Sequence, residues 1–206
     1  ETLNESAYRR VALNQGKIEQ MALNCESVAR LEDPVGRIQQ ATRLDDGLDL
    51  YRVSCPIGVI LVIFESRPDA VVQISTLAIK SGNAVILKGG REAQHSNRKL
   101  VELLRETASQ VDGMPIEAIS LIETREDVAM LVRMSDELDM IIPRGSNELV
   151  RSIQSQAQVP VLGHADGICH VYLDAEADLK KALEIVIDAK TEYPAVCNAM
   201  ETLLVD

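Results

Sequence analysis

The sequence has 206 residues, of which 46% are hydrophobic and 26% are charged, enough for one good-sized core or two modest ones. Acidic residues outnumber basic ones by 32 to 21, for a net charge of −11, and aromatic residues are scarce, which argues against a nucleic-acid-binding protein. No apolar run approaches the roughly 20 residues that span a bilayer, and the first residues do not look like a signal segment; we expect a soluble cytoplasmic protein, or a mitochondrial or plastid one if a targeting segment is missing.

The N-terminal quarter predicts a helix followed by a hairpin. Apolar residues recur at helical spacing between Ile18 and Ala29. From Thr42 to Ser54 the pattern changes, and Asp46-Gly47 is typical of a tight hairpin turn. This hairpin precedes a longer region with a different pattern of apolar residues.

In that region, short apolar runs alternate with segments of helical periodicity, which is typical of strands joined by crossover helices. The predicted class is therefore α/β, with a parallel sheet. The candidate strands are 58–64, 84–87, 118–122, 139–142 and 168–173, and helical faces lie within 70–78, 100–111 and 149–157. No internal repeat or low-complexity linker is present, and the most plausible domain boundary lies near Gln158 and Pro160.

Ligands of open parallel sheets bind beyond the carboxyl ends of the strands, so the loops that follow the strands are the candidate sites. Lys88, Gly89, Gly90 and Arg91 follow the second strand. Glycines permit close approach of a ligand to the backbone, and two cations beside a helix N-terminus suit a phosphate. The alternative is a tight turn with a solvated arginine, because the loop matches neither common phosphate-binding motif.

Two more loops carry polar residues after strands. Gly145 and Ser146 lead into a helix and suit a pyrophosphate, or form only a tight turn. Ser66 and Arg67 follow the first strand of the sheet and place a hydroxyl and a guanidinium at the same edge. The alternative for this loop is a capped helix start, and for Arg67 a structural ion pair.

Near the C-terminus a cysteine lies between a helix and a strand. Helical periodicity runs from Asp178 to Lys190, Pro194 prevents continuation of the helix, and residues 202–205 are strand-like. Cys197 therefore lies on a loop held by two regular elements, where nucleophiles are often found. Its alternative role is that of an inert core thiol.

The remaining cysteines and the histidines suggest no metal site and no disulfide framework. Cys25, Cys55, Cys169 and Cys197 are widely spaced, and the three histidines form no metal-binding motif. We interpret all four cysteines as reduced thiols.

Taken together, these segments resemble the aldehyde dehydrogenase superfamily, and within it the glutamyl phosphate reductases, including the reductase half of bifunctional pyrroline-5-carboxylate synthases. The resemblance covers nearly the whole chain. It rests on Asp33-Pro34-Val35-Gly36-Arg37, Pro56-Ile57-Gly58-Val59-Ile60, Glu65-Ser66-Arg67-Pro68, residues 81–90, Ile142-Pro143-Arg144-Gly145-Ser146, residues 167–172 and residues 197–205.

The resemblance implies reduction of γ-glutamyl phosphate by NADPH to glutamate-5-semialdehyde and phosphate, a step of proline biosynthesis. The thioester intermediate would form on Cys197. The backbone N–H of Cys197, Asn198 and the hydroxyl of Ser66 are candidate donors to the oxyanion. Arg67 is the candidate ligand of the substrate carboxylate or phosphate.

The resemblance also indicates how the cofactor is bound and whether the thioester is hydrolysed by water. Lys88 matches a family lysine near the adenosine ribose, and Arg91 replaces an acidic residue of NAD-selective relatives, so NADPH is expected over NADH. Hydrolytic aldehyde dehydrogenases carry a glutamate general base where this chain has Val161. Release of a free acid is therefore disfavoured.

The implied architecture is a Rossmann-type NADP-binding domain over residues 1–158, a hairpin oligomerisation arm at about 42–54, and the start of a catalytic domain over residues 159–206. We expect at least a dimer, a chain that represents a fragment of a longer protein, and a possible fused or associated glutamate kinase. The competing hypotheses are a general aldehyde dehydrogenase and a non-catalytic NADP-binding or assembly module.

Overall fold

The computed structural model describes all residues except 1–7, 9–10, 66, 164–166 and 195–196. The chain divides into two compact units, residues 1–163 and residues 164–206. This division lies close to the boundary expected near residue 158, although the roles assigned to the two units remain predictions. Among the described residues, no helix combines the length and the apolar character that crossing a membrane requires.

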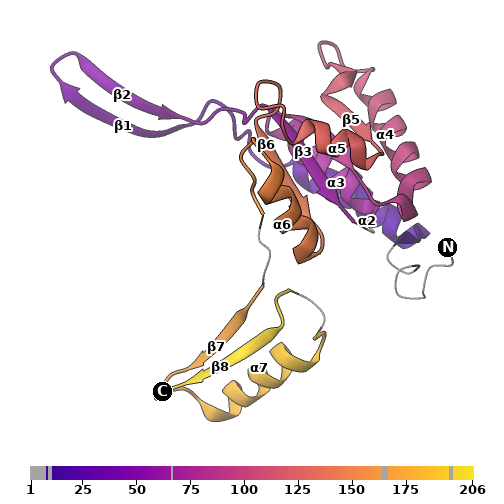
Figure 1. The fold of residues 1–206 in the computed structure, drawn as a ribbon. Coiled ribbons are helices and arrows are strands. Elements are labelled where there is room, and N and C mark those ends of the chain that lie inside the picture. Colours follow the sequence, from indigo (N-terminus) through magenta and orange to yellow (C-terminus); the bar gives the residue numbers. More distant parts are fainter. Residues whose placement is uncertain (1–7, 9–10, 66, 164–166, 195–196) are drawn as a thin grey trace. The chain divides into compact units, whose positions relative to one another are not determined.

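The first unit is built on a four-stranded parallel sheet, which confirms the predicted α/β class (Figure 1). The strand order is β5-β4-β3-β6, and each strand lies within two residues of a predicted one. The strands are β3 (Val59–Phe64), β4 (Ala84–Lys88), β5 (Ile119–Ile122) and β6 (Met140–Arg144).

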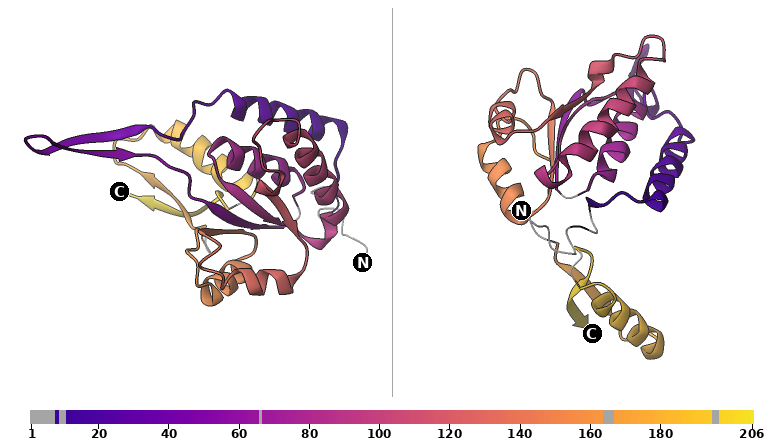
Figure 2. Two further views of the ribbon diagram at one scale, coloured as in Figure 1. Left: turned by 90° about the horizontal axis from the view of Figure 1, so that it is seen from above. Right: turned by 90° about the vertical axis from the view of Figure 1, so that its right-hand side faces the viewer.

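Helices cover both faces of this sheet (Figure 2). They are α3 (Asp69–Lys80) and α4 (Gln94–Ala108) on one face, and α5 (Arg125–Leu131) and α6 (Asn147–Gln156) on the other. The central strand β3 divides its side chains between the two cores: Ile60, Val62 and Phe64 pack with α3 and α4, whereas Leu61 and Ile63 pack toward α5 and α6. An apolar run without polar positions is what a strand buried on both faces requires.

Sequence periodicity did not predict α5, and it ended β6 too early. Helix α5 is only seven residues long and begins with a capping box, in which Thr124 and Asp127 each accept a hydrogen bond from the other's backbone N–H. Strand β6 continues through Pro143, which had been expected in a loop. Because β6 lies at the end of the sheet, a missing N–H on its outer side removes no bond to another strand.

A short stretch of chain runs along the outer side of β6. The backbone N–H of Ile141 donates to Pro160, and the N–H of Leu162 donates to Ile141. Val161 thereby forms an isolated parallel bridge with β6 and packs against the core that contains Leu61 and Ile63.

An N-terminal helix and the hairpin complete the first unit. Helix α2 (Gln15–Ala29) packs on α3 and buries Met21. The hairpin consists of β1 (Ile38–Asp45) and β2 (Leu48–Val53), so it begins four residues before the predicted start at Thr42. It protrudes from the sheet as a two-stranded ribbon (Figure 1).

The second unit is a single strand–helix–strand motif. Strand β7 (Cys169–Leu173) leads through α7 (Leu179–Thr191) to β8 (Met200–Val205), and the two strands pair in parallel. The side chain of Asp178 caps α7, as the predicted start of this helix requires.

Candidate active site

The carboxyl ends of the four parallel strands bring the predicted site loops of the first unit to one edge of the sheet. The register places Ile63 beside Lys88, Lys88 beside Ile122, and Phe64 beside Arg144. The chain leaves β3 toward α3 on one face and leaves β6 toward α6 on the other face. Such a divergence of loops is where parallel sheets bind ligands.

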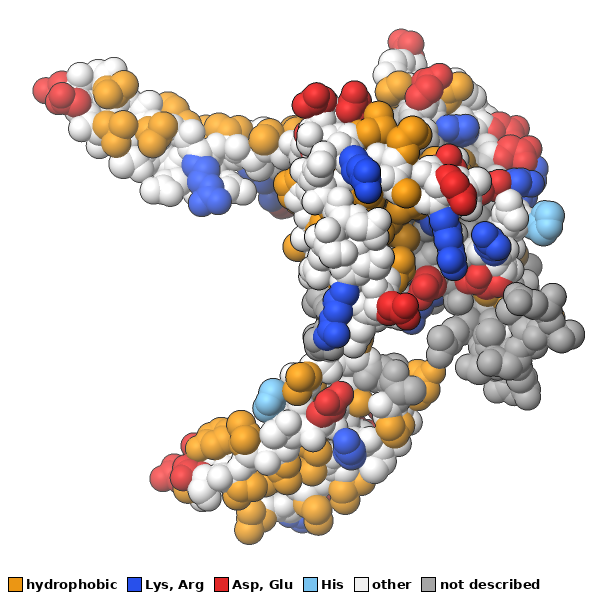
Figure 3. Space-filling model, in the orientation of Figure 1, with side chains coloured by type: hydrophobic (Ala, Val, Ile, Leu, Met, Phe, Trp, Pro, Cys, Tyr) orange, Lys and Arg blue, Asp and Glu red, His pale blue; other side chains and the backbone are white. Residues whose placement is uncertain are grey.

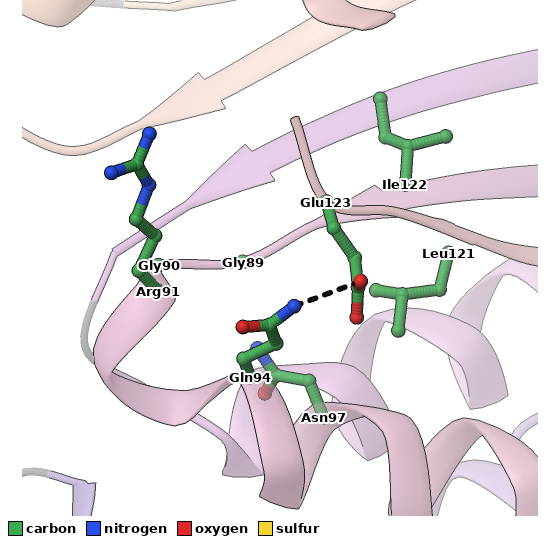
Figure 4. A pocket seen from close by; sticks show the side chains of 8 residues that line it. All are labelled: Gly89, Gly90, Arg91, Gln94, Asn97, Leu121, Ile122 and Glu123. Atoms are coloured by element: carbon green, nitrogen blue, oxygen red, sulfur yellow. Dashed lines mark hydrogen bonds between the residues drawn. The ribbon is translucent and has the colours of Figure 1, made fainter. Parts of the chain in front are cut away.

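A pocket lies at this edge between the loop after β4 and the loop after β5 (Figure 4). Its walls come from the predicted phosphate loop, the start of α4 and the end of β5. The lining residues are Gly89, Gly90, Arg91, Gln94, Asn97, Leu121, Ile122 and Glu123.

The side chain of Asn97 lines this pocket. Asn97 is 3% exposed, and its Oδ1 accepts no hydrogen bond from the described residues. A buried polar atom without a partner is costly. A Cβ atom on Gly89 would lie 2.1 Å from Asn97 Nδ2, so glycine is needed for the helix to approach the loop this closely.

A carboxylate forms the opposite wall of the pocket. Glu123 accepts two hydrogen bonds of 2.5 Å from Arg98, at Nε and at a terminal nitrogen, and a third of 2.8 Å from Gln94. The bidentate contact with Arg98 holds the pKa of Glu123 below its usual range. Glu123 is therefore a fixed negative charge at the pocket.

Lys88 ends β4 and lies half-buried beside the pocket. Its ammonium donates a 3.0 Å hydrogen bond to the carbonyl of Gly89. Burial lowers the pKa of Lys88, and the nearby charge of Arg125 lowers it further, while the carboxylate of Glu92 opposes the shift. An anionic ligand would restore the solvation that this ammonium lacks.

Gly90 and Arg91 complete the loop that was predicted to hold a phosphate. Gly90 caps a short 3₁₀ helix, Arg91–Ala93, that leads directly into α4. The Arg91 side chain is exposed and extends away from Gln94 and Glu123 (Figure 4). Among the described residues it forms no ion pair, so its guanidinium is available to a ligand at the pocket's outer side.

The loop after β6 holds a carboxylate of this chain at the place predicted for a pyrophosphate. The backbone N–H of Ser146 donates a 3.2 Å hydrogen bond to Glu65 Oε2, and the Ser146 hydroxyl caps α6. A Cβ atom on Gly145 would lie 2.7 Å from the same oxygen. The anionic group at this helix N-terminus is therefore the carboxylate of Glu65, and the pyrophosphate site stays a prediction.

Arg67 lies at the same edge, after β3. It is exposed, and in the described part of the chain its guanidinium forms no ion pair. The neighbouring Ser66, a predicted oxyanion donor, lies outside the described residues.

The second unit carries the predicted nucleophile. Cys197 is a free, exposed thiol on the loop between α7 and β8, as the sequence predicts, and Asn198 beside it is also exposed. Within the described residues, no group of three or more histidine, cysteine or acidic side chains could hold a metal ion.

Sequence reasoning missed Gln94, Asn97 and Glu123. Two signals pointed to them: Gln94 and Asn97 follow Arg91 at intervals of three residues, which places them on one side of the helix start. Glu123 directly follows an apolar strand, which is the position that identified the other loops.

Comparison with known proteins gives a consistent answer. The model of the aldehyde dehydrogenase family matches residues 7–206. The gamma-glutamyl phosphate reductase of Pelotomaculum thermopropionicum is 55% identical over 205 residues, which is 100% of this chain and 47% of that protein. The corresponding reductase of Saccharomyces cerevisiae is 51% identical, over 99% of this chain and 46% of its own length.

A solved structure shows the same similarity. The crystal structure of gamma-glutamyl phosphate reductase from Thermotoga maritima superposes with a TM-score of 0.93 at 41% identity, covering 98% of this chain and 49% of that one. The chain thus spans about half the length of the curated relatives it matches. The match to the aldehyde dehydrogenase family implies a nicotinamide cofactor.

The lowered pKa of Lys88 predicts a pH-dependent affinity for the cofactor. As the pH rises through that pKa, the Lys88 ammonium loses its charge. We expect the dissociation constant for NADP⁺ to rise by roughly tenfold or more, because a hydrogen bond to a charged group contributes about 1.5–3 kcal/mol. Isothermal titration calorimetry between about pH 7 and about pH 10 measures it. Lys88→Arg should show no such rise, and equal profiles for the two proteins would exclude the role of Lys88.

The contact between Glu65 and Ser146 predicts that Glu65 competes with cofactor phosphate. In Glu65→Gln the negative charge at the start of α6 is removed, and NADP⁺ should bind roughly two- to fivefold more tightly, as expected from about 0.3–1 kcal/mol for an anion at a helix N-terminus. The matched control is Glu148→Gln, which removes an exposed charge from the first turn of the same helix. An equal gain in both variants would show a general charge effect and argue against a phosphate at Gly145 and Ser146.

Proposed function

Because this chain belongs to the aldehyde dehydrogenase family, we propose that it supplies the cofactor-binding part and the nucleophile of an NADPH-dependent γ-glutamyl phosphate reductase. The observation that carries the proposal is the 55% identity to a reductase of that name over the whole chain. The reaction is γ-glutamyl phosphate + NADPH + H⁺ → glutamate-5-semialdehyde + NADP⁺ + phosphate, in proline biosynthesis. Residues 1–158 are the NADP-binding domain of this proposal, and residues 159–206 begin its catalytic domain.

Cys197 is the proposed nucleophile. Its thiolate attacks the acyl carbon of γ-glutamyl phosphate, the carbon–oxygen bond to phosphate breaks, and a thioester forms on Sγ. The bound reduced nicotinamide supplies the hydride that reduces this thioester. The resulting hemithioacetal then collapses to the aldehyde, and the thiol is regenerated. The exposed position of Cys197 on a loop supports this role.

Two tetrahedral species carry negative charge on oxygen during this sequence. The backbone N–H of Cys197 and the amide of Asn198 are the proposed donors, because they lie on the same turn as the sulfur. Ser66 is proposed as a third donor. Arg67 is proposed to bind the substrate carboxylate or phosphate, since its guanidinium is exposed and free of ion pairs to described residues.

The proposed cofactor site is the loop after β4. Lys88 reaches the adenosine ribose, Gly89 and Gly90 allow close approach, and Arg91 pairs with the 2′-phosphate that distinguishes NADPH from NADH. The unpartnered amide of Asn97 fits a ligand rich in donors, such as a ribose or an adenine. Gly145 and Ser146 are proposed to bind pyrophosphate, which requires Glu65 to move from the N–H of Ser146.

A general aldehyde dehydrogenase is the second candidate, and Val161 opposes it. A hydrolytic enzyme needs a base that activates water against the thioester. Val161 is apolar, packs against the core behind β6, and is held by the backbone bonds of Ile141. The thioester must persist until it is reduced. A valine at this position cannot activate water to hydrolyse it, whereas a carboxylate could.

The hairpin is the proposed oligomerisation arm. Apolar side chains that are about half exposed or more lie along both strands (Figure 3): Ile38, Leu44, Leu48, Leu50, Tyr51 and Val53. A two-stranded ribbon is marginally stable by itself. We propose that the arm packs against a second copy of the chain, giving at least a dimer.

The reaction and its nucleophile are tested together by the reverse reaction on the full-length protein. With pyrroline-5-carboxylate, phosphate and NADP⁺, absorbance of NADPH should rise only when phosphate is present. Cys197→Ala should lose this activity by about 10³-fold or more, because a covalent nucleophile has no substitute. NADP⁺ binding should be unchanged in that variant.

Cys55→Ser is the matched control, since Cys55 is an exposed thiol outside the proposed site. It should retain full activity. Turnover that persists in Cys197→Ala would overturn the mechanism, and NADP⁺ binding without any turnover in the parent protein would favour the non-catalytic module.

The role of the hairpin predicts a change in oligomeric state. Leu50→Asp places a charge in the proposed contact and should weaken self-association by roughly tenfold or more, because burial of a leucine contributes about 2 kcal/mol. Light scattering across a dilution series measures this. Gln39→Asp adds the same charge to β1 without removing an apolar side chain, and an equal loss in that control would argue against an apolar interface at Leu50.

A further inference from the structure

Two cysteines of the second unit lie close together. Cys169 is the first residue of β7, and Cys197 lies three residues before the start of β8, its parallel partner. The Sγ of Cys169 donates a 3.3 Å hydrogen bond to the backbone carbonyl of Cys197. Both are free thiols. The proposed nucleophile therefore has a second thiol in contact with its own backbone.

The backbone around the two thiols is closely packed. A Cβ atom on Gly167 would lie 2.7 Å from the carbonyl oxygen of Cys197 and 3.2 Å from its Cβ. The loop that carries Cys197 thus rests directly on the segment that leads into β7, and glycine is required for this approach. Cys197 is exposed and Cys169 is half-buried, so an oxidant from solvent meets Cys197 first.

We propose that Cys197 and Cys169 form a redox-active pair, in which a peroxide oxidises Cys197 and Cys169 resolves the product to a disulfide. The inference rests on the proposed function in one respect, the nucleophilic character of Cys197. The two steps are Cys–S⁻ + H₂O₂ → Cys–SOH + OH⁻, followed by Cys–SOH + HS–Cys → Cys–S–S–Cys + H₂O. Peroxide gains the two electrons that the sulfurs lose.

The contact between the two residues makes this bond geometrically accessible. A disulfide needs Cα atoms about 4.4–6.8 Å apart. Cys169 pairs with Met200, and the turn before Met200 brings the carbonyl of Cys197 to 3.3 Å from the sulfur of Cys169. The disulfide would block thioester formation and protect Cys197 from irreversible oxidation.

The test is oxidation of the full-length protein with a small excess of hydrogen peroxide, followed by alkylation with N-ethylmaleimide and peptide mass spectrometry. The expected result is loss of alkylation at both Cys169 and Cys197, a linked peptide that contains both, and recovery of both thiols with dithiothreitol. In Cys169→Ser, Cys197 should instead react with dimedone as a sulfenic acid and proceed to sulfinic acid, which dithiothreitol does not reverse.

Cys55→Ser serves as the control and should form the same linked peptide as the parent protein. Sulfinic Cys197 beside an alkylatable Cys169 in the parent protein would overturn the inference, as would a link between other cysteines. The readout does not depend on turnover. A linked peptide in a protein without reductase activity would support the redox-active pair and contradict the proposed reductase function. Reductase activity without a linked peptide would support the function and contradict the redox-active pair.

Discussion

Burial of β3 on both faces is the constraint on which the first unit depends. This strand pairs with β4 on one side and β6 on the other, and its alternate side chains enter two separate cores. A strand in that position must be apolar throughout, so polar residues such as Glu65 and Arg67 can follow only beyond its end. The same geometry brings the ends of β4, β5 and β6 to this edge, and the polar residues of four loops share one surface as a result.

Much of this arrangement could be predicted from the sequence, because its signals are strong and local. Continuous apolar runs identified the buried strands, Asp46-Gly47 identified the hairpin turn, and Pro194 placed Cys197 on a loop. The loop from Lys88 to Arg91 was predicted as a phosphate site from its glycines and cations after a strand; Gly89, Gly90 and Arg91 line a pocket, and the phosphate role stays a prediction. Each of these predictions relied on residues whose local conformational preference agrees with the conformation they adopt in the fold.

The parts that were missed depend on contacts between distant segments. Helix α5 is too short to show a clear period, and it is identified by its capping residues instead. Glu65 lies at the N–H of Ser146, 81 positions away in the sequence, and no local pattern reveals that an internal carboxylate takes the place expected for a phosphate. The predicted strand ended at Ile142, where its apolar run ends, whereas β6 continues through Pro143 because a proline is tolerated at the end of a sheet.

The chain that runs beside β6 also affects how this protein meets other chains. Exposed strand edges act as templates for pairing and aggregation. Here the bonds of Ile141 with Pro160 and Leu162, together with the missing N–H of Pro143, leave the outer side of β6 a poor template. Among the described residues the hairpin has no such cover, since each of its two strands pairs only with the other. The proposed assembly of this chain and its misassembly would therefore use the same two strands, so a partner seated on the hairpin would also shield those strands from aggregation.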